Sequence, residues 1–467
     1  MTSRVLALVV LLFSASSAQA NEGRNVLFIM ADDLKCDLGC YGHSVARTPN
    51  IDRLAARGVR FNHAYCQYPV CNPSRASLMS GRRPENTRIV DNATPPREKL
   101  PHAVFLPQHF RQHGRRAVKV GKIFHTGDAF EDPASWDIDI RETRAAKNPP
   151  QQQIARQQQR SGIVLRCEDQ ATWDGFVARR GAELLGELSA AQQPFFLAVG
   201  FRRPHSPYIA PQRYYDLYPT DHIPLVHDPG QPWRDIPDLA LTYRQGKPRL
   251  ALEDRQSTAA AYYASVSFMD AQLGVLLDAM DRLNLWENTV VVFVSDHGYH
   301  LGDHGGLWHK MTLFENATRV PLIVAAPAVR PAVTDALVEL VDLYPTLSDL
   351  CQLPMPAELE GVSFAPLLYQ PAREWKSAAF SVVARGGTAA PGDRLDPQRL
   401  GRTLRTSHYR YTLWPDGAEE LYDERRDPGE LNNLAAQPDL SALRSELAKR
   451  LAAGWRESLP AEMATNQ

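Results

Sequence analysis

The 467-residue sequence lacks an excess of charge of either sign: Lys and Arg total 52, and Asp and Glu total 53. A nucleic-acid-binding protein would show a basic excess, so this balance argues against that class. Apolar residues make up 44% of the chain, which is too many for a protein that is disordered as a whole. A chain of this length is expected to hold about three domains, or one large and one small domain.

Long apolar runs are also lacking, and the one marked run lies at the N-terminus. Arg4 precedes Val5 to Phe13, which is too short to span a bilayer, and Ala18-Gln19-Ala20 matches the cleavage pattern of secretory signals. Residues 1–20 are therefore predicted to be a signal peptide that is cleaved near Ala20. We expect a secreted or periplasmic protein without a membrane anchor.

Cysteine is scarce, and no two cysteines have the CxxC spacing of a structural zinc site. The chain has six cysteines: Cys36, Cys40, Cys66, Cys71, Cys167 and Cys351. An even number in an exported chain invites a disulfide interpretation, but the core of a chain this long does not need such cross-links. If Cys71 takes part in chemistry, at least one of the other cysteines stays unpaired, so no specific disulfide is predicted.

Three short apolar runs, rich in β-branched residues and without polar alternation, are predicted to be buried parallel strands. They are Val26 to Met30, Phe195 to Val199 and Val290 to Val294. Each run is followed by polar residues, in order Asp32-Asp33, Arg202-Arg203-Pro204-His205 and Ser295-Asp296-His297-Gly298. Because ligands bind outside the carboxyl ends of the strands in open α/β sheets, we expect these polar clusters to share one edge of the sheet.

Helical patterns lie between the predicted strands, at residues 51–55 and from Thr258 to Leu283, so the fold class is α/β. Near the C-terminus the pattern changes to short alternating runs such as Tyr409 to Leu413, followed by a final helix from Asp439 to Arg456. We therefore divide the mature chain into a large unit at residues 21–368 and a smaller α+β unit at residues 369–467.

Adjacent carboxylates at the end of a buried strand are costly unless a cation neutralises them, and Asp32 and Asp33 occupy such a position. Asp296 ends another strand in the same way and is followed by His297. Helix capping by Asp32 and a turn opened by Asp296 are the alternatives, since aspartate is common in both places. The repetition at two strand ends favours a hard divalent cation, Ca²⁺ or Mg²⁺, over a transition metal.

The segment from Cys71 to Arg82 reads CNPSRASLMSGR. It resembles the signature of the type I sulfatases, C-x-P-S-R followed by L-x-T-G-R, with Ser80 in place of the usual threonine. Further motifs typical of that family follow in the same order, namely Gly121-Lys122-Ile123-Phe124-His125, Arg203-Pro204-His205, Ser295-Asp296-His297-Gly298, Leu301-Gly302-Asp303-His304-Gly305 and His309-Lys310. The K-x-x-H spacing and His297 resemble the iduronate-2-sulfatase branch most closely.

The resemblance implies a fold, an activity and a modification. The fold is an alkaline-phosphatase-like α/β/α sandwich with a smaller α+β C-terminal domain, and the activity is hydrolysis of sulfate esters. A separate formylglycine-generating enzyme, or an equivalent maturase, converts the family's cysteine at the position of Cys71 to Cα-formylglycine. One hydroxyl of the hydrated aldehyde attacks sulfur, and loss of the other hydroxyl's proton then expels sulfate, which divides one hard step into two.

The resemblance also implies a metal site with one Ca²⁺ per subunit, Mg²⁺ being the alternative. Its ligands are Asp32, Asp33, Asp296, His297 and an oxygen of the modified Cys71. The cation lowers the pKa of the diol and polarises the sulfate oxygens. Arg75 lies four residues after Cys71, so a helix that starts near Pro73 would turn it back toward the nucleophile, where it stabilises the alkoxide.

Four further positions match residues that handle sulfate and protons in the family: Lys122, His125, His205 and Lys310. The two lysines would clamp the sulfate oxygens, where negative charge develops. His125 would deprotonate the second hydroxyl. The acid that protonates the leaving oxygen is either His205 or Lys310, and the sequence does not choose between them.

The substrate that the resemblance implies is a sulfated sugar or polysaccharide, with a uronate 2-sulfate as the leading choice. Its selection is expected to depend on the loops at residues 141–162, 228–250 and 383–400. Two rival functions stay open: a phosphonate or phosphodiester hydrolase of the same superfamily, and an inactive carbohydrate-binding relative. A glycosidase is disfavoured, because the adjacent Asp32 and Asp33 cannot flank a sugar from two sides.

Three further histidines are expected to have structural roles only: His300, His304 and His309. His304 could also contact the metal ligands from behind.

Overall fold

The computed structural model describes residues 23–141, 158–159, 162–224, 235–241, 250–385 and 399–460. The predicted signal peptide at residues 1–20 lies outside the described residues. So do large parts of the three loops on which substrate selection was expected to depend. In the described parts of the chain, no helix is both long enough and apolar enough to cross a membrane.

The centre of the molecule is an eight-stranded sheet with the strand order β13-β2-β12-β9-β1-β7-β3-β4. Its strands are β1 (Asn25–Asp32), β2 (Val59–Tyr65), β3 (Arg116–Gly121), β4 (Ile138–Ile140), β7 (Phe195–Pro204), β9 (Thr289–Ser295), β12 (Arg319–Ala325) and β13 (Ala332–Glu339). Strand β1 pairs in parallel with β7 on one side and with β9 on the other. The three strands predicted from the sequence are thus confirmed, and they are direct neighbours.

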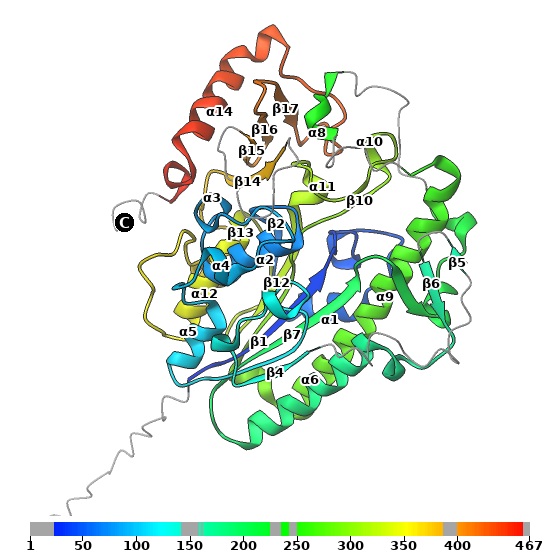
Figure 1. Ribbon diagram of the computed structural model, residues 1–467, viewed down its shortest axis with the longest axis vertical. Coiled ribbons are helices and arrows are strands. Elements are labelled where there is room, and N and C mark those ends of the chain that lie inside the picture. Colours follow the sequence, from blue (N-terminus) through cyan, green and yellow to red (C-terminus); the bar gives the residue numbers. More distant parts are fainter. Residues whose placement is uncertain are drawn as a thin grey trace, which may run out of the picture.

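Helices cover both faces of this sheet (Figure 1). One face carries α1 (Pro49–Ala55), α6 (Trp173–Ala190) and α9 (Leu252–Arg282), and the other carries α2 (Cys71–Ser80), α5 (Leu106–Gln112) and α12 (Leu343–Leu350). Strand β1 has no polar alternation because both of its faces are buried: Leu27 and Ile29 belong to one core cluster, and Val26 and Phe28 to the other. The expected α/β/α sandwich is confirmed.

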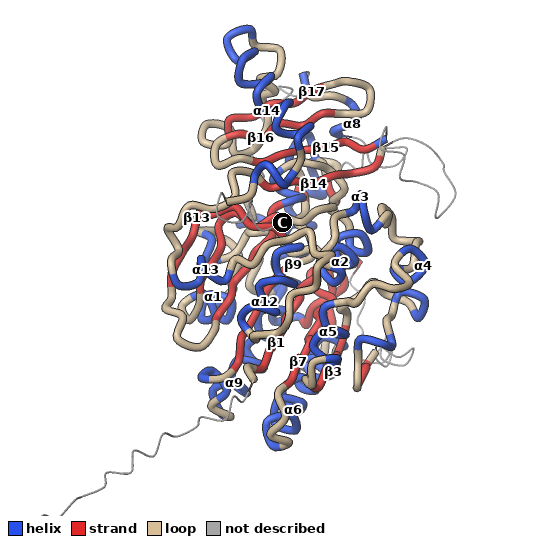
Figure 2. Tube along the Cα trace, turned by 90° about the vertical axis from the view of Figure 1, so that its left-hand side faces the viewer, coloured by secondary structure: helices blue, strands red, loops and turns tan. Residues whose placement is uncertain are grey.

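A second, antiparallel sheet forms the C-terminal part of the fold and lies beyond one end of the large sheet (Figure 2). It consists of β14 (Ala379–Ala384), β15 (Leu400–Arg405), β16 (Tyr409–Leu413) and β17 (Glu419–Asp423), and α14 (Ser441–Ala453) packs on it through the buried Leu447. The Val382 N–H donates to the Gln67 carbonyl at 2.9 Å, which joins this sheet to the segment before Cys71. The smaller α+β unit is confirmed, while its boundary at residue 369 stays a prediction.

Two helix boundaries differ from those predicted. Helix α9 begins at Leu252 rather than Thr258, because its first turn is exposed and carries Glu253 and Asp254, so it shows no apolar periodicity. Helix α14 is shorter than predicted, because Gly454 leaves the helical conformation with φ +86°.

The remaining short elements are α3 (Pro84–Thr87), α4 (Pro96–Lys99), α7 (Gln212–Tyr215), α8 (Asp238–Leu241), α10 (Asp303–Gly306), α11 (Glu315–Thr318), α13 (Ala365–Tyr369), β5 (Gln158–Gln159), β6 (Gly162–Leu165), β8 (Tyr208–Pro211), β10 (His300–Leu301) and β11 (Trp308–His309).

Candidate active site

The carboxyl ends of β1, β7 and β9 bring the predicted polar clusters together. Asp32 is the last residue of β1 and pairs with Pro204 of β7, while the preceding Ala31 pairs with Ser295 of β9. The chain then turns sharply at Asp33, which has φ +64°, and its N–H donates to Oδ1 of Asp296 at 3.3 Å. Aspartate tolerates this left-handed conformation better than most residues. The strand order therefore assembles three buried carboxylates at one edge.

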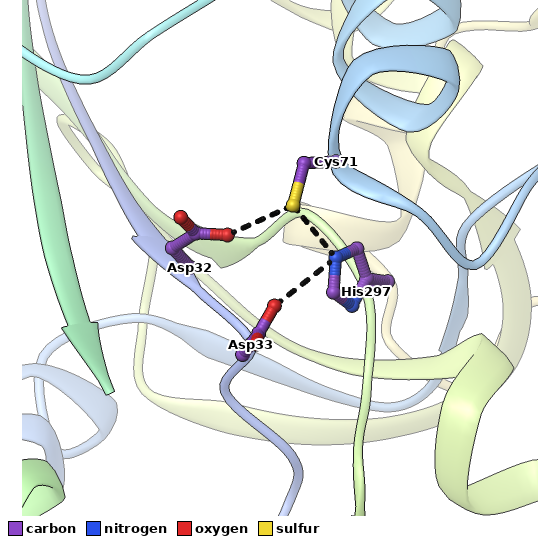
Figure 3. Close-up of side chains that lie close together, drawn as sticks. All are labelled: Asp32, Asp33, Cys71 and His297. Atoms are coloured by element: carbon purple, nitrogen blue, oxygen red, sulfur yellow. Dashed lines mark hydrogen bonds and ion pairs between the residues drawn. The ribbon is translucent and has the colours of Figure 1, made fainter. Parts of the chain in front are cut away.

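Cys71 lies at the centre of this group, as the first residue of α2 and fully buried. Its Sγ is 3.3 Å from Oδ1 of Asp32 and 3.4 Å from Nε2 of His297, and that nitrogen is 3.3 Å from Oδ1 of Asp33 (Figure 3). The ligand atoms of these four side chains all lie within 4.8 Å of one another. Such a spacing suits coordination of a single ion.

His297 is oriented for metal binding. Its Nδ1 is 2.9 Å from the Gly298 carbonyl, so Nδ1 carries a proton, and Nε2 is the nitrogen that faces the carboxylates and could bind an ion. Burial lowers the pKa of His297, but Asp296 outweighs burial and raises the pKa to about 9. The carboxylates thus stabilise positive charge at this position. Three aspartates with one imidazole fit a divalent cation of the hard type.

Arg75 adds a further buried charge, one helical turn beyond Cys71. Its Nε donates to Oδ2 of Asp296 at 2.7 Å, and its Nη1 donates to the carbonyls of Lys122 and Ile123 at 2.8 and 2.9 Å. Its Nη2 lies 3.7 Å from Oδ1 of Asp32. The guanidinium therefore lies between two carboxylates and the segment after β3. Its contacts fix the positions of these three groups relative to one another.

Two lysines approach the nucleophile position from separate loops. Lys122, just after β3, contacts Asp32, and Lys310, just after β11, contacts Asp33 and lies 3.3 Å from the Sγ of Cys71. Burial raises the pKa of the Cys71 thiol, but Lys122, Lys310 and His297 outweigh it and hold that pKa well below its usual value. A site that stabilises an anion at this atom is suited to an anionic nucleophile and an anionic substrate.

The two predicted proton-transfer histidines both lie near the Cys71 thiol and interact with it. Their environments differ. Burial lowers the pKa of His125, whereas for His205 burial is outweighed by Asp33 and Asp32, which raise its pKa. Near neutral pH this arrangement provides one neutral imidazole and one that holds its proton more strongly.

All the predicted site residues thus lie around one point, whereas His300 and His304 form a second buried cluster with Asp303. In that cluster His300 Nε2 lies 2.6 Å from Oγ1 of Thr312, and His304 Nε2 lies 3.0 Å from the Glu430 carbonyl. Protein atoms therefore occupy the ring nitrogens that a metal would need. The hydrogen bonds of His304 run to Asp303 and Glu430, so this side chain braces the C-terminal unit.

Two residues whose contacts support the nucleophile, Ser74 and Asn72, were not predicted from the sequence. The Ser74 hydroxyl donates to the Asp296 carbonyl, and the Asn72 N–H donates to Oδ1 of Asn92 at 3.0 Å. The side chain of Asn72 also donates to the Asp91 and Thr94 carbonyls, each at 2.8 Å. Ser74 belongs to the C-x-P-S-R motif and was therefore available as a signal, whereas nothing local in the sequence pairs Asn72 with Asn92.

Both the sequence and the fold are similar to those of known proteins. The family model described as sulfatase matches residues 24–353, and the model described as N-sulphoglucosamine sulphohydrolase, C-terminal, matches residues 302–457. The chain is 32% identical to the iduronate 2-sulfatase of Mus musculus over 86% of both chains. It is also 32% identical to a sulfatase of Formosa agariphila over 93% of this chain and 88% of that protein.

A solved structure is similar across nearly the whole chain. The phosphonate monoester hydrolase of Agrobacterium radiobacter superposes with a TM-score of 0.79 at 24% identity, covering 92% of this chain and 95% of that one. At this identity the likeness supports the fold, and the sequence relatives support the activity. The chain therefore belongs to the sulfatase family and is a sulfuric ester hydrolase.

Proposed function

We propose that this protein is an exported, formylglycine-dependent sulfatase that removes sulfate from a sulfated sugar. The observation that carries the proposal is the setting of Cys71. Its Sγ lies within 3.4 Å of a carboxylate, an imidazole and a lysine, at the first turn of α2. A buried structural cysteine has no need of such neighbours.

The modified Cys71 would supply the nucleophile, and Asp32, Asp33, Asp296 and His297 would hold Ca²⁺, with Mg²⁺ as the alternative. When bound, the cation neutralises buried carboxylates and polarises sulfate oxygens. The donor set fits such an ion, because ligand atoms of Asp32, Asp33 and His297 lie within 4.8 Å of one another, and Oδ1 of Asp296 lies 3.6 Å from Nε2 of His297. Arg75 keeps Asp296 in place, so the position of the ligands does not depend on the ion alone.

Lys122 and Lys310 bind the sulfate group in this proposal. Their ammonium groups approach from separate loops and contact Asp32 and Asp33, two carboxylates of the cluster around the Cys71 sulfur. Two fixed cations at this point stabilise the negative charge that sulfate oxygens carry in the transition state. Burial of Lys310 keeps water from competing for the same contacts.

Proton transfer is divided between the two histidines. His125, whose pKa is lowered by burial, accepts the proton of the second hydroxyl on the modified Cys71. His205, whose pKa is raised by Asp33 and Asp32, donates to the leaving oxygen. Burial opposes the charge of Lys310, but Asp33 outweighs it and raises its pKa well above the usual value, so Lys310 gives up a proton less readily than His205. This difference favours His205 as the acid.

The substrate proposed is a uronate 2-sulfate within a sulfated carbohydrate. Support comes from the K-x-x-H spacing of Lys122 and His125 and from the iduronate 2-sulfatase among the relatives of this chain. The signal peptide at residues 1–20 would export the enzyme to where such polymers occur. A maturase that modifies Cys71 is the one protein partner required.

Substrate turnover tests this function. We expect multiple turnover of an aryl sulfate, little turnover of an aryl phosphate diester, and faster sulfate release from a 2-O-sulfated uronate disaccharide than from a 6-O-sulfated glucosamine. Released sulfate, measured by ion chromatography, is the readout for the sugars. Turnover of the phosphorus ester alone would assign the phosphodiesterase function instead. Glycan binding that survives both a chelator and Cys71→Ala, without sulfate release, would indicate a non-catalytic relative.

A further inference from the structure

The backbone on both sides of Lys310 adopts an unusual conformation. His309 has φ +149° and Met311 has φ +70°, and neither residue is a glycine. Side chains disfavour this half of conformational space, so such a segment persists only where surrounding contacts hold it in place. The position of the Lys310 ammonium group therefore depends on what holds its neighbours.

Two main-chain contacts hold Met311. Its N–H donates to the Pro69 carbonyl at 3.1 Å, which ties it to the segment that leads into Cys71. Its own carbonyl accepts a hydrogen bond from Nη2 of Arg385. Arg385 directly follows β14, so this second contact comes from the small C-terminal sheet.

The Arg385 side chain is buried and held in place by several contacts. It is 6% exposed, its Nε donates to the Leu239 carbonyl at 2.8 Å, and its guanidinium lies 5.1 Å from the centre of the Trp414 ring. Burial lowers the pKa of Arg385 to about 10. A buried guanidinium whose nitrogens go to carbonyls is expensive to retain for stability alone.

We propose that Arg385 is a positioning residue for sulfate hydrolysis: it holds the Met311 carbonyl and thereby fixes Lys310 against Asp33 and the nucleophile. The C-terminal sheet is then a working part of the active site and not only a neighbour of it. This inference rests on the proposed role of Lys310 in binding sulfate.

A double-mutant cycle with Arg385→Met and Lys310→Ala tests the inference. Misplacement of a catalytic group by about 1 Å costs about a hundredfold in rate, so Arg385→Met should lower kcat/KM for an aryl sulfate by about tenfold to a hundredfold. In the Lys310→Ala background the same change should have almost no further effect, because the group that it positions is already gone. Equal losses in both backgrounds would overturn the inference, as would full activity of Arg385→Met.

Two further variants separate positioning from loss of stability. Leu447→Ala removes a buried side chain from the C-terminal unit, in a core cluster that does not include Arg385 or Met311. It should lower Tm while leaving kcat/KM unchanged. If Arg385→Met does not fold, Arg385→Lys replaces it in the cycle, because one ammonium cannot reach both the Leu239 and Met311 carbonyls. If Lys310→Ala alone keeps full activity, the proposed role of Lys310 fails, which is a separate result from additivity in the cycle.

Discussion

Cys71→Ser should release one equivalent of product per active site and then stop. The serine hydroxyl occupies the place of the Sγ atom, between Asp32, His297 and Lys310, and can attack sulfur as a single hydroxyl. It has no second hydroxyl whose deprotonation would expel sulfate, so the ester stays on the protein. Mass spectrometry of the variant after incubation with substrate should show the added mass of one SO₃ group on the serine that replaces the cysteine.

Cys66→Ser is the matched control, because Cys66 is also buried and lies five residues earlier, with its Sγ near the Ala317 carbonyl and outside the cluster around Cys71. We expect this variant to turn over repeatedly, with no sulfate on the substituted position. Repeated turnover by Cys71→Ser would contradict the elimination step, because a simple alcohol would then suffice as the nucleophile.

Removal of the cation should lower the turnover rate by at least about a thousandfold, since a bound metal contributes several kcal/mol of transition-state stabilisation. Stability should fall as well. An ion present at about 100 times its Kd stabilises the folded state by about 2.7 kcal/mol, so a chelator should lower Tm measurably. Addition of Ca²⁺ or Mg²⁺ in turn then identifies the ion that restores both activity and Tm.

Asp33→Asn locates that ion, because it removes one carboxylate from the cluster around Cys71. Its Tm should no longer respond to chelator or to added cation. Asp303→Asn is the control from the second buried cluster, where protein atoms already occupy the histidine nitrogens, and its Tm should still respond. If the response disappeared in Asp303→Asn and persisted in Asp33→Asn, the ion would belong to the second cluster.

The sequence was most informative where local pattern and topology coincide. Buried parallel strands are apolar on both faces, so β1, β7 and β9 could be recognised one by one, and their polar ends had to share an edge. That rule is sufficient to predict that Asp32, Asp33, Asp296 and His205 lie together. The positions of Lys122, His125 and Lys310 came from motif resemblance, because nothing in their spacing alone places them near Cys71.

Contacts between the two sheets could not be predicted from the sequence. Arg385 and Met311 are 74 residues apart, and a hydrogen bond to a main-chain carbonyl leaves no trace in the identity of the accepting residue. The same holds for the Asn92 contact with the Asn72 N–H. Exposed helix turns such as the start of α9 were missed for a different reason, since solvent-facing residues carry no apolar period.

Modification of Cys71 is the central claim, and mass spectrometry of the tryptic peptide from Phe61 to Arg75 tests it most directly. The protein should be purified from its natural host, where the maturase is present. The peptide also contains Cys66, which reports any artefactual oxidation. The account predicts an aldehyde at Cys71 and an intact thiol at Cys66. An unmodified thiol at Cys71 in fully active protein would contradict the account, because the proposed nucleophile would not exist.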